Sequence, residues 1–283
     1  MPERLVRVDG LELCAEDFGN PADPAIVLVM GAQASMLWWP EGFCRNFANR
    51  GFHVIRYDHR DVGRSSSYAL GQPPYALADL AGDIFRVMDG FGLATAHLVG
   101  FSMGGYLLQA AAAAEPQRVA SLAIWGAGPL ADVPDLPGMD PDLLDFLMSA
   151  MPADWTDEAA VVAFHVEGAR RMRGGRFPFD EAAQTRLAQG EFRRARDRAS
   201  ALNHAAYDTS HPDVAPAIRA PVLVIHGDRD PVTPAAHAHT LAGRLPDARL
   251  TILEGIGHEL PPGVWPEVIE AIIGNIRRAV PPD

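Results

Sequence analysis

One pentapeptide, Gly100-Phe101-Ser102-Met103-Gly104, holds a serine between two glycines. It follows an apolar stretch at residues 96–99 and opens a helical stretch that Pro116 ends. In this strand–turn–helix setting, G-x-S-x-G places a serine hydroxyl on a sharp, strained turn. Neighbours without side chains, Gly100 and Gly104, leave room for the backbone to pass closely. The pattern predicts that Ser102 is a nucleophile.

A serine hydroxyl is a weak nucleophile at neutral pH, so it needs a base within hydrogen-bond reach and a carboxylate that orients the base. Ten histidines compete for the role of base. His258 lies in a glycine-flanked loop after a predicted strand, at the sheet edge that also carries Ser102. His226 ends a strand and His237 lies on a helical stretch, so we expect local roles for both. We therefore predict His258 as the base.

The carboxylate should lie between serine and histidine in chain order. Asp228 and Asp230 compete for this role, because both leave a predicted strand at the correct edge. Asp132, after the preceding strand, is a weaker candidate. A residue directly beside the strand end points back into the turn, whereas one two positions further reaches toward the histidine loop, which favours Asp230.

Acyl transfer develops an oxyanion that backbone N–H groups must stabilise. We expect these donors to be Met103, which follows the serine at a helix N-terminus, and Ala32, in the loop after the strand at 26–30. Four apolar side chains could line an acyl or alcohol pocket or could equally be core residues: Met36, Trp38, Trp39 and Tyr106.

Short apolar runs alternate with helical patterns, as in a mostly parallel sheet covered by helices. The runs lie at residues 26–30, 53–57, 96–99, 122–125 and 222–225. Asp9-Gly10 predicts an antiparallel edge hairpin. Apolar residues at helical spacing between Trp265 and Ile276 predict a final helix on the sheet. We expect an α/β core at residues 1–129 and 216–283, with a helical cap inserted at 130–215.

Composition excludes several classes of function. The formal net charge is −12, which disfavours binding to nucleic acid. All 24 basic residues are arginine, so no mechanism that needs a catalytic lysine applies. Two cysteines, Cys14 and Cys44, lack zinc-site spacing, and we expect no metal. No secretory signal or apolar run of membrane-spanning length is evident, so a cytoplasmic protein is expected. The oligomeric state is not predicted.

After the strand at 53–57 the chain contains a D-x-R-x-x-G-x-S stretch, formed by Asp58, Arg60, Gly63 and Ser65. Together with the serine, aspartate and histidine in this order, it makes the chain resemble the α/β-hydrolase-fold serine hydrolases. Within them it is most similar to the anthracycline methylesterases, typified by aclacinomycin methylesterase. The family's G-x-x-D-x-x-x-P pattern, counted from Gly227, falls on Asp230 and not on Asp228.

The resemblance implies hydrolysis of a small-molecule carboxylic ester through a serine acyl-enzyme, without a cofactor. A methyl ester of a bulky, polyketide-like acid fits this subfamily. The same triad also serves cofactor-free perhydrolases, lactonases and carbon–carbon bond hydrolases, which fold and triad do not separate. A hydrolase-fold binding protein that does no chemistry is a further alternative, and turnover of a chromogenic ester distinguishes it from an enzyme.

Overall fold

A computed structural model describes residues 2–206 and 212–279, and its strands form one eight-stranded sheet in the order β1-β2-β4-β3-β5-β6-β7-β8. The strands are β1 (Arg4–Val8), β2 (Leu11–Phe18), β3 (Ala25–Val29), β4 (His53–Tyr57), β5 (Ala96–Phe101), β6 (Val119–Trp125), β7 (Val222–Gly227) and β8 (Ala248–Leu253). The pairs from β4 to β8 are all parallel. The predicted α/β class is confirmed.

The predicted edge hairpin is present. β1 pairs antiparallel with β2, and Val8 pairs with Leu11 across the turn. The two turn residues, Asp9 and Gly10, have φ of 51° and 81°. Positive φ at both positions matches the right-handed twist of the flanking strands, which is why an Asp-Gly pair suits this turn.

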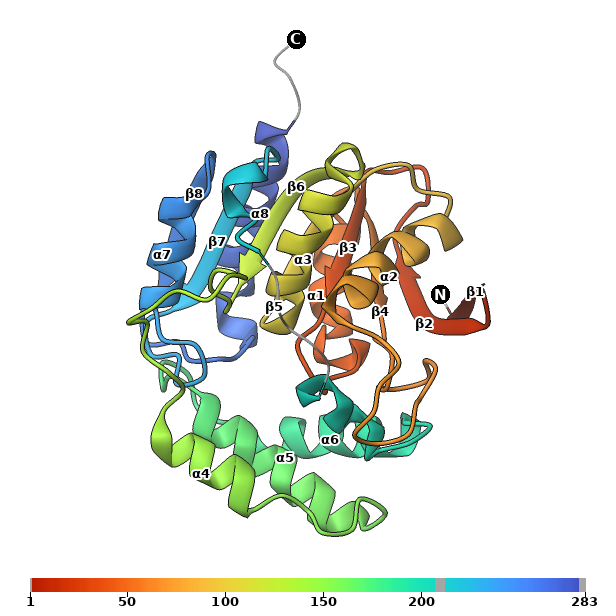
Figure 1. The fold of residues 1–283 in the computed structure, drawn as a ribbon, viewed down its shortest axis with the longest axis vertical. Helices are drawn as coiled ribbons and strands as arrows, with labels where there is room; N and C mark the ends of the chain where they lie inside the picture. The colour runs from red at the N-terminus through yellow and green to blue at the C-terminus, as the bar shows by residue number, and fades with distance from the viewer. Residues whose placement is uncertain (1, 207–211, 280–283) are drawn as a thin grey trace.

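Helices cover both faces of the sheet, as Figure 1 shows. Those outside the cap are α1 (Glu41–Ala48), α2 (Leu77–Gly90), α3 (Met103–Ala114), α7 (Ala236–Arg244) and α8 (Trp265–Arg278). Helices α2, α3 and α7 pack into one apolar cluster, and α1 and α8 into the other. Strands β3 and β4 are buried along their whole length because both faces are covered. The sequence of β3 is accordingly apolar throughout, whereas β4 also buries His53 and Arg56, which pair with Asp17 and Glu16 on β2.

The cap segment, residues 130–215, lies between β6 and β7 and is helical in the part that the structure describes. It contains α4 (Pro141–Ser149), α5 (Glu158–Met172), α6 (Glu181–Arg194) and the 3-10 turn Ser200–Ala205. In Figure 1 these helices, drawn in green and cyan, lie together beyond one end of the sheet. Residues 207–211 lie outside the described part of the chain. The shorter 3-10 turns are Met36–Trp38, Pro116–Arg118, Ala215–Ala217 and Pro262–Val264.

A buried arginine fastens the cap segment to the core. Arg194, at the end of α6, donates to Asp58 Oδ2 at 2.6 Å and to Glu3 Oε1 at 2.7 Å. The Arg194 side chain is 7% exposed and the Asp58 side chain is fully buried. Removing one member of such a pair leaves a buried charge uncompensated, which is costly. The cap helices are therefore held against the loop that follows β4.

Candidate active site

Ser102 lies on the sharp turn between β5 and α3. Its φ of 53° and ψ of −120° place a non-glycine residue in a strained region of backbone space. A Cβ on Gly100 would lie 2.6 Å from the carbonyl carbon of Gly104, and a Cβ on Gly104 would lie 2.1 Å from the Val29 carbonyl oxygen. Neither position accommodates a side chain. The glycines of G-x-S-x-G are thus required by backbone contacts on both sides of the serine.

Asp230 and His258 form a hydrogen-bonded pair at the same edge of the sheet, after β7 and β8. His258 Nδ1 lies 2.7 Å from Asp230 Oδ2, and a carboxylate only accepts, so Nδ1 carries the proton. Asp230 Oδ1 accepts the amides of Val232 and Thr233, each at 2.8 Å. The Asp230 side chain is 1% exposed. Both carboxylate oxygens are therefore occupied, and their orientation is fixed.

Asp228 has a different environment from Asp230. Its Oδ1 accepts the Gly255 amide at 2.7 Å, in an exposed turn. The structure thus brings Asp230, and not Asp228, to His258. The imidazole of His258 also packs on Phe101, with ring centroids 4.7 Å apart, and Phe101 directly precedes Ser102. This contact places His258 beside the serine turn.

The loop after β3, residues 30–36, lies against Ser102 and is called the oxyanion loop below. A Cβ on Gly31 would lie 3.1 Å from Ser102 Cβ and 3.6 Å from Ser102 Oγ. Met103 is the first residue of α3, so its N–H has no acceptor within the helix. The two predicted donors, the Ala32 and Met103 amides, therefore belong to segments that both adjoin Ser102.

Polar groups from distant parts of the chain hold the oxyanion loop in place. Four side chains form hydrogen bonds with its backbone. His59 Nε2 donates to the Met30 carbonyl at 2.9 Å, and His204 Nδ1 accepts from the Gln33 amide at 2.9 Å. Glu191 Oε1 accepts from the Ser35 amide at 3.1 Å, and Asp58 Oδ1 accepts from the Met36 amide at 2.9 Å. Burial lowers the pKa of His59 to about 3, so this imidazole is neutral at physiological pH. Two of these supports, His204 and Glu191, come from the cap segment.

The residues of the D-x-R-x-x-G-x-S stretch hold the loop after β4 in place by hydrogen bonds and close packing. Arg60 binds Asp83 through two hydrogen bonds of 2.7 and 2.8 Å. Ser65 Oγ donates to the carbonyl of Asp58 at 2.7 Å. Gly63 has a φ of 56°, and a Cβ there would lie 2.3 Å from Asp58 Oδ2. The motif thereby fixes Asp58, which binds both the oxyanion loop and Arg194.

Comparison with known proteins gives the family. The model of the alpha/beta hydrolase fold matches residues 24–261. The chain belongs to the α/β-hydrolase family. This hydrolase is 34% identical over 306 residues to rhodomycin D methylesterase DauP of Streptomyces sp. (strain C5), with 99% of each chain covered. The expected likeness to anthracycline methylesterases is confirmed.

Two further similar proteins are named as hydrolases of 2-hydroxy-6-oxo compounds. A 2-hydroxy-6-oxononadienedioate/2-hydroxy-6-oxononatrienedioate hydrolase of Burkholderia vietnamiensis is 31% identical, with 88% of this chain and 86% of that protein covered. The solved structure of a 2-hydroxy-6-oxo-6-phenylhexa-2,4-dienoate hydrolase from Rhodococcus sp. strain RHA1 superposes with a TM-score of 0.78 at 22% identity, covering 98% of both chains. That structural likeness shows the shared fold.

The four apolar residues considered for a substrate pocket of this hydrolase are divided by the structure. Trp39 is fully buried and stacks on Phe43 with centroids 5.5 Å apart, which fits the alternative of a core residue. Met36 is also fully buried. Trp38 and Tyr106 are half-buried, and the Tyr106 hydroxyl accepts the Gly128 amide at 3.2 Å. The residue types alone do not show which of these apolar side chains point into the core.

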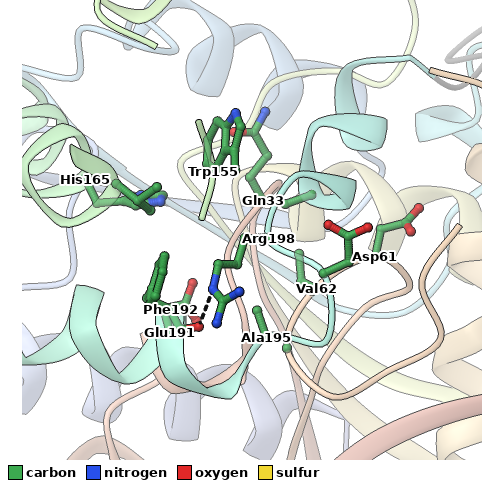
Figure 2. Close-up of a pocket in the computed structure, with 13 residues that line it drawn as sticks. Gln33, Asp61, Val62, Trp155, His165, Glu191, Phe192, Ala195 and Arg198 are labelled. Atoms are coloured by element: carbon green, nitrogen blue, oxygen red, sulfur yellow. Dashed lines mark hydrogen bonds between the residues drawn. The ribbon is translucent and has the colours of Figure 1, made fainter. Parts of the chain in front are cut away.

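A cavity of about 40 Å³ lies between the cap segment and the core of this α/β hydrolase (Figure 2). On the core side, Gln33 of the oxyanion loop lines it together with Asp61 and Val62; Trp155 and His165 face it from the cap segment. None of the four predicted apolar residues lines this cavity. It was not predicted, because its walls join segments more than ninety residues apart in the chain.

The described residues offer no group of three or more His, Cys, Asp or Glu side chains that could hold a metal ion. In the same ranges, none of the helices combines the length and apolar character needed to cross a membrane.

Proposed function

We propose that this α/β hydrolase cleaves a carboxylic ester through an acyl-enzyme on Ser102. The observation that carries the proposal is the partly buried 2.7 Å hydrogen bond between His258 Nδ1 and Asp230, made beside the strained turn of Ser102. With its proton on Nδ1, the neutral imidazole presents the lone pair of Nε2. That lone pair can accept the proton of the Ser102 hydroxyl.

In the proposed reaction, Ser102 Oγ attacks the ester carbonyl carbon as His258 takes the hydroxyl proton. The oxyanion of the tetrahedral intermediate accepts hydrogen bonds from the Ala32 and Met103 amides. The carbon–oxygen bond to the alcohol then breaks, and His258 returns its proton to the leaving alkoxide. Water, deprotonated by His258, attacks the acyl-enzyme in the same way and releases the acid.

The likeness to the rhodomycin D methylesterase, which covers 99% of both chains, supports a methyl ester of a bulky acid as the substrate class. We further propose that the cap segment, residues 130–215, covers the site and selects the substrate, with residues 1–129 and 216–283 forming the catalytic core. The cavity that the cap segment shares with the oxyanion loop supports this division.

A second candidate is hydrolysis of a carbon–carbon bond, which the 31% identical Burkholderia relative favours. One screen separates the two functions: native protein and the Ser102→Ala variant are assayed on methyl esters of bulky acids, short acyl esters, lactones and a 2-hydroxy-6-oxodienoate. We expect Ser102-dependent turnover of esters. Turnover of the dienoate with no ester cleavage would replace the first function by the second.

A further inference from the structure

Part of the cap segment is bonded directly to the loop that carries His258. The loop, residues 255–259, is called the base loop here; the connection between α5 and α6, residues 173–180, is called the cap turn. His258 N donates to the carbonyl of Met172, the last residue of α5, at 2.8 Å. Arg176 N donates to the Gly255 carbonyl at 2.9 Å. The backbone on either side of the imidazole therefore rests on the cap segment.

One side chain completes this contact. Glu259 Oε1 accepts the amide of Gly174 in the cap turn at 2.8 Å and the amide of Gly257 in its own loop at 3.3 Å. Both amides donate to the same oxygen, so one acceptor at the end of this side chain links two segments of backbone. Glu259 thus joins the cap turn to the residues on both sides of His258.

The glycines at this junction show how closely the backbones approach. A Cβ on Gly174 would lie 2.3 Å from the carbonyl carbon of Ile256, and a Cβ on Gly257 would lie 2.1 Å from the Met172 carbonyl oxygen. On the other side, a Cβ on Gly227, at the end of β7, would lie 2.2 Å from the Ile256 carbonyl oxygen. The base loop is therefore packed, backbone against backbone, between the cap turn and the strand end that leads to Asp230.

Such packing restricts the position of the imidazole from both directions. Asp230 fixes the ring at Nδ1, and the cap turn fixes the backbone of the same residue. If the cap turn withdrew, the base loop would lose its support on one side, and the distance between His258 and Ser102 would become variable. A misplacement of about 1 Å in a catalytic group can cost as much as 100-fold in rate.

We propose that Glu259 is a positioning residue for His258, and that the cap turn supports the base in addition to covering the substrate. This inference rests on the proposed function, since it assigns Glu259 an effect on proton transfer by His258. Glu259 acts by holding the base loop against Gly174. Its reach to the two amides matters more than its charge.

Three substitutions of Glu259 separate reach from charge. Glu259→Gln keeps an oxygen at the same distance, Glu259→Asp keeps the charge but shortens the side chain by one methylene, and Glu259→Ala removes both. Glu254, an exposed acid just before the base loop, provides the matched control in Glu254→Ala. All variants are titrated with a serine-directed phosphonate, so that kcat is expressed per reactive Ser102 and any misfolded fraction is not counted.

We expect Glu259→Ala and Glu259→Asp to lower kcat about tenfold with little change in KM. The rate of phosphonate labelling at Ser102 should fall by the same factor, because labelling needs the base but not the substrate pocket. Glu259→Gln should retain most of the native rate, and Glu254→Ala all of it. A purely structural role would lower the number of titrated sites and leave kcat per site unchanged.

Two results would overturn the proposal while the proposed function stands: native kcat per site in Glu259→Ala, or a loss in Glu259→Gln equal to that in Glu259→Ala. If Glu259→Ala does not fold, Glu259→Asp and Glu259→Gln still decide between reach and charge. Full ester turnover by Ser102→Ala, measured alongside, would instead remove the proposed function and this inference together.

Discussion

Replacing Asp230 by asparagine should inactivate the enzyme without unfolding it, and the contacts of the carboxylate explain why. Its Oδ1 accepts two amides, of Val232 and Thr233, at 2.8 Å each. An asparagine keeps its oxygen toward these two donors, because its NH₂ group cannot accept from them. The NH₂ group must then occupy the place of Oδ2, which faces His258 Nδ1.

This orientation reverses the hydrogen bond to the base. A donating NH₂ group requires Nδ1 to accept, so the proton of the neutral imidazole moves to Nε2. His258 then has no lone pair toward Ser102 and cannot take its proton. The same change in a well-studied serine protease lowers turnover about ten-thousand-fold. That factor corresponds to about 5.5 kcal/mol of transition-state stabilisation.

The assay compares purified Asp230→Asn and Asp228→Asn on one ester, with thermal unfolding measured for both. Asp228 accepts a single amide, that of Gly255, in an exposed turn and does not contact His258. We expect Asp230→Asn to lose about four orders of magnitude in kcat and Asp228→Asn to stay within tenfold of native. Near-normal turnover by Asp230→Asn beside an inactive Asp228→Asn would refute the assignment.

Three further outcomes are expected. His258→Ala should abolish turnover, whereas His237→Ala should behave as native, because the His237 ring binds the Pro137 carbonyl; an unchanged rate in His258→Ala would reject His258 as the base. Burial raises the pKa of Glu191 to about 7, and the hydrogen bond from the Ser35 side chain opposes this rise only in part, so the stabilisation from Glu191 is complete below the ordinary glutamate pKa of 4.5 and is lost as pH rises through about 7. Urea unfolding should show Glu191→Gln gaining stability relative to native protein between pH 5 and pH 8, by at most about 3 kcal/mol, whereas a constant difference would argue against this. Trp155→Ala enlarges the cavity under the cap segment and should change the ranking of esters more than kcat on the best one, and an unaltered ranking over a broad panel would leave this residue a structural role only.

Local patterns were sufficient for the sheet and for the residues at its edge. β4 begins and ends at the predicted residues, His53 and Tyr57, because its mainly apolar residues lie between turns and are buried on both faces. The serine turn was predictable for a steric reason, since only glycine fits at Gly100 and Gly104. Asp230 was chosen over Asp228 from its spacing after a strand end, and the structure places it at His258.

Contacts between residues far apart in the chain have no local sequence pattern that would predict them. His204 binds the amide of Gln33 across 171 positions, and Glu259 binds that of Gly174 across 85. Neither pair has a spacing or periodicity that a single sequence reveals. The sequence leaves Trp39 open between pocket and core for a related reason: residue type predicts burial, but the choice between core and pocket depends on which helix packs over the side chain.

The central claim, that Ser102 is the nucleophile of an acyl-transfer reaction, is tested most directly by mass spectrometry after reaction with a serine-directed phosphonate. We predict one adduct per chain, mapped to Ser102, with loss of ester hydrolysis in proportion to labelling and no adduct in Ser102→Ala. An adduct at another residue, or labelling and turnover that persist in Ser102→Ala, would contradict the claim.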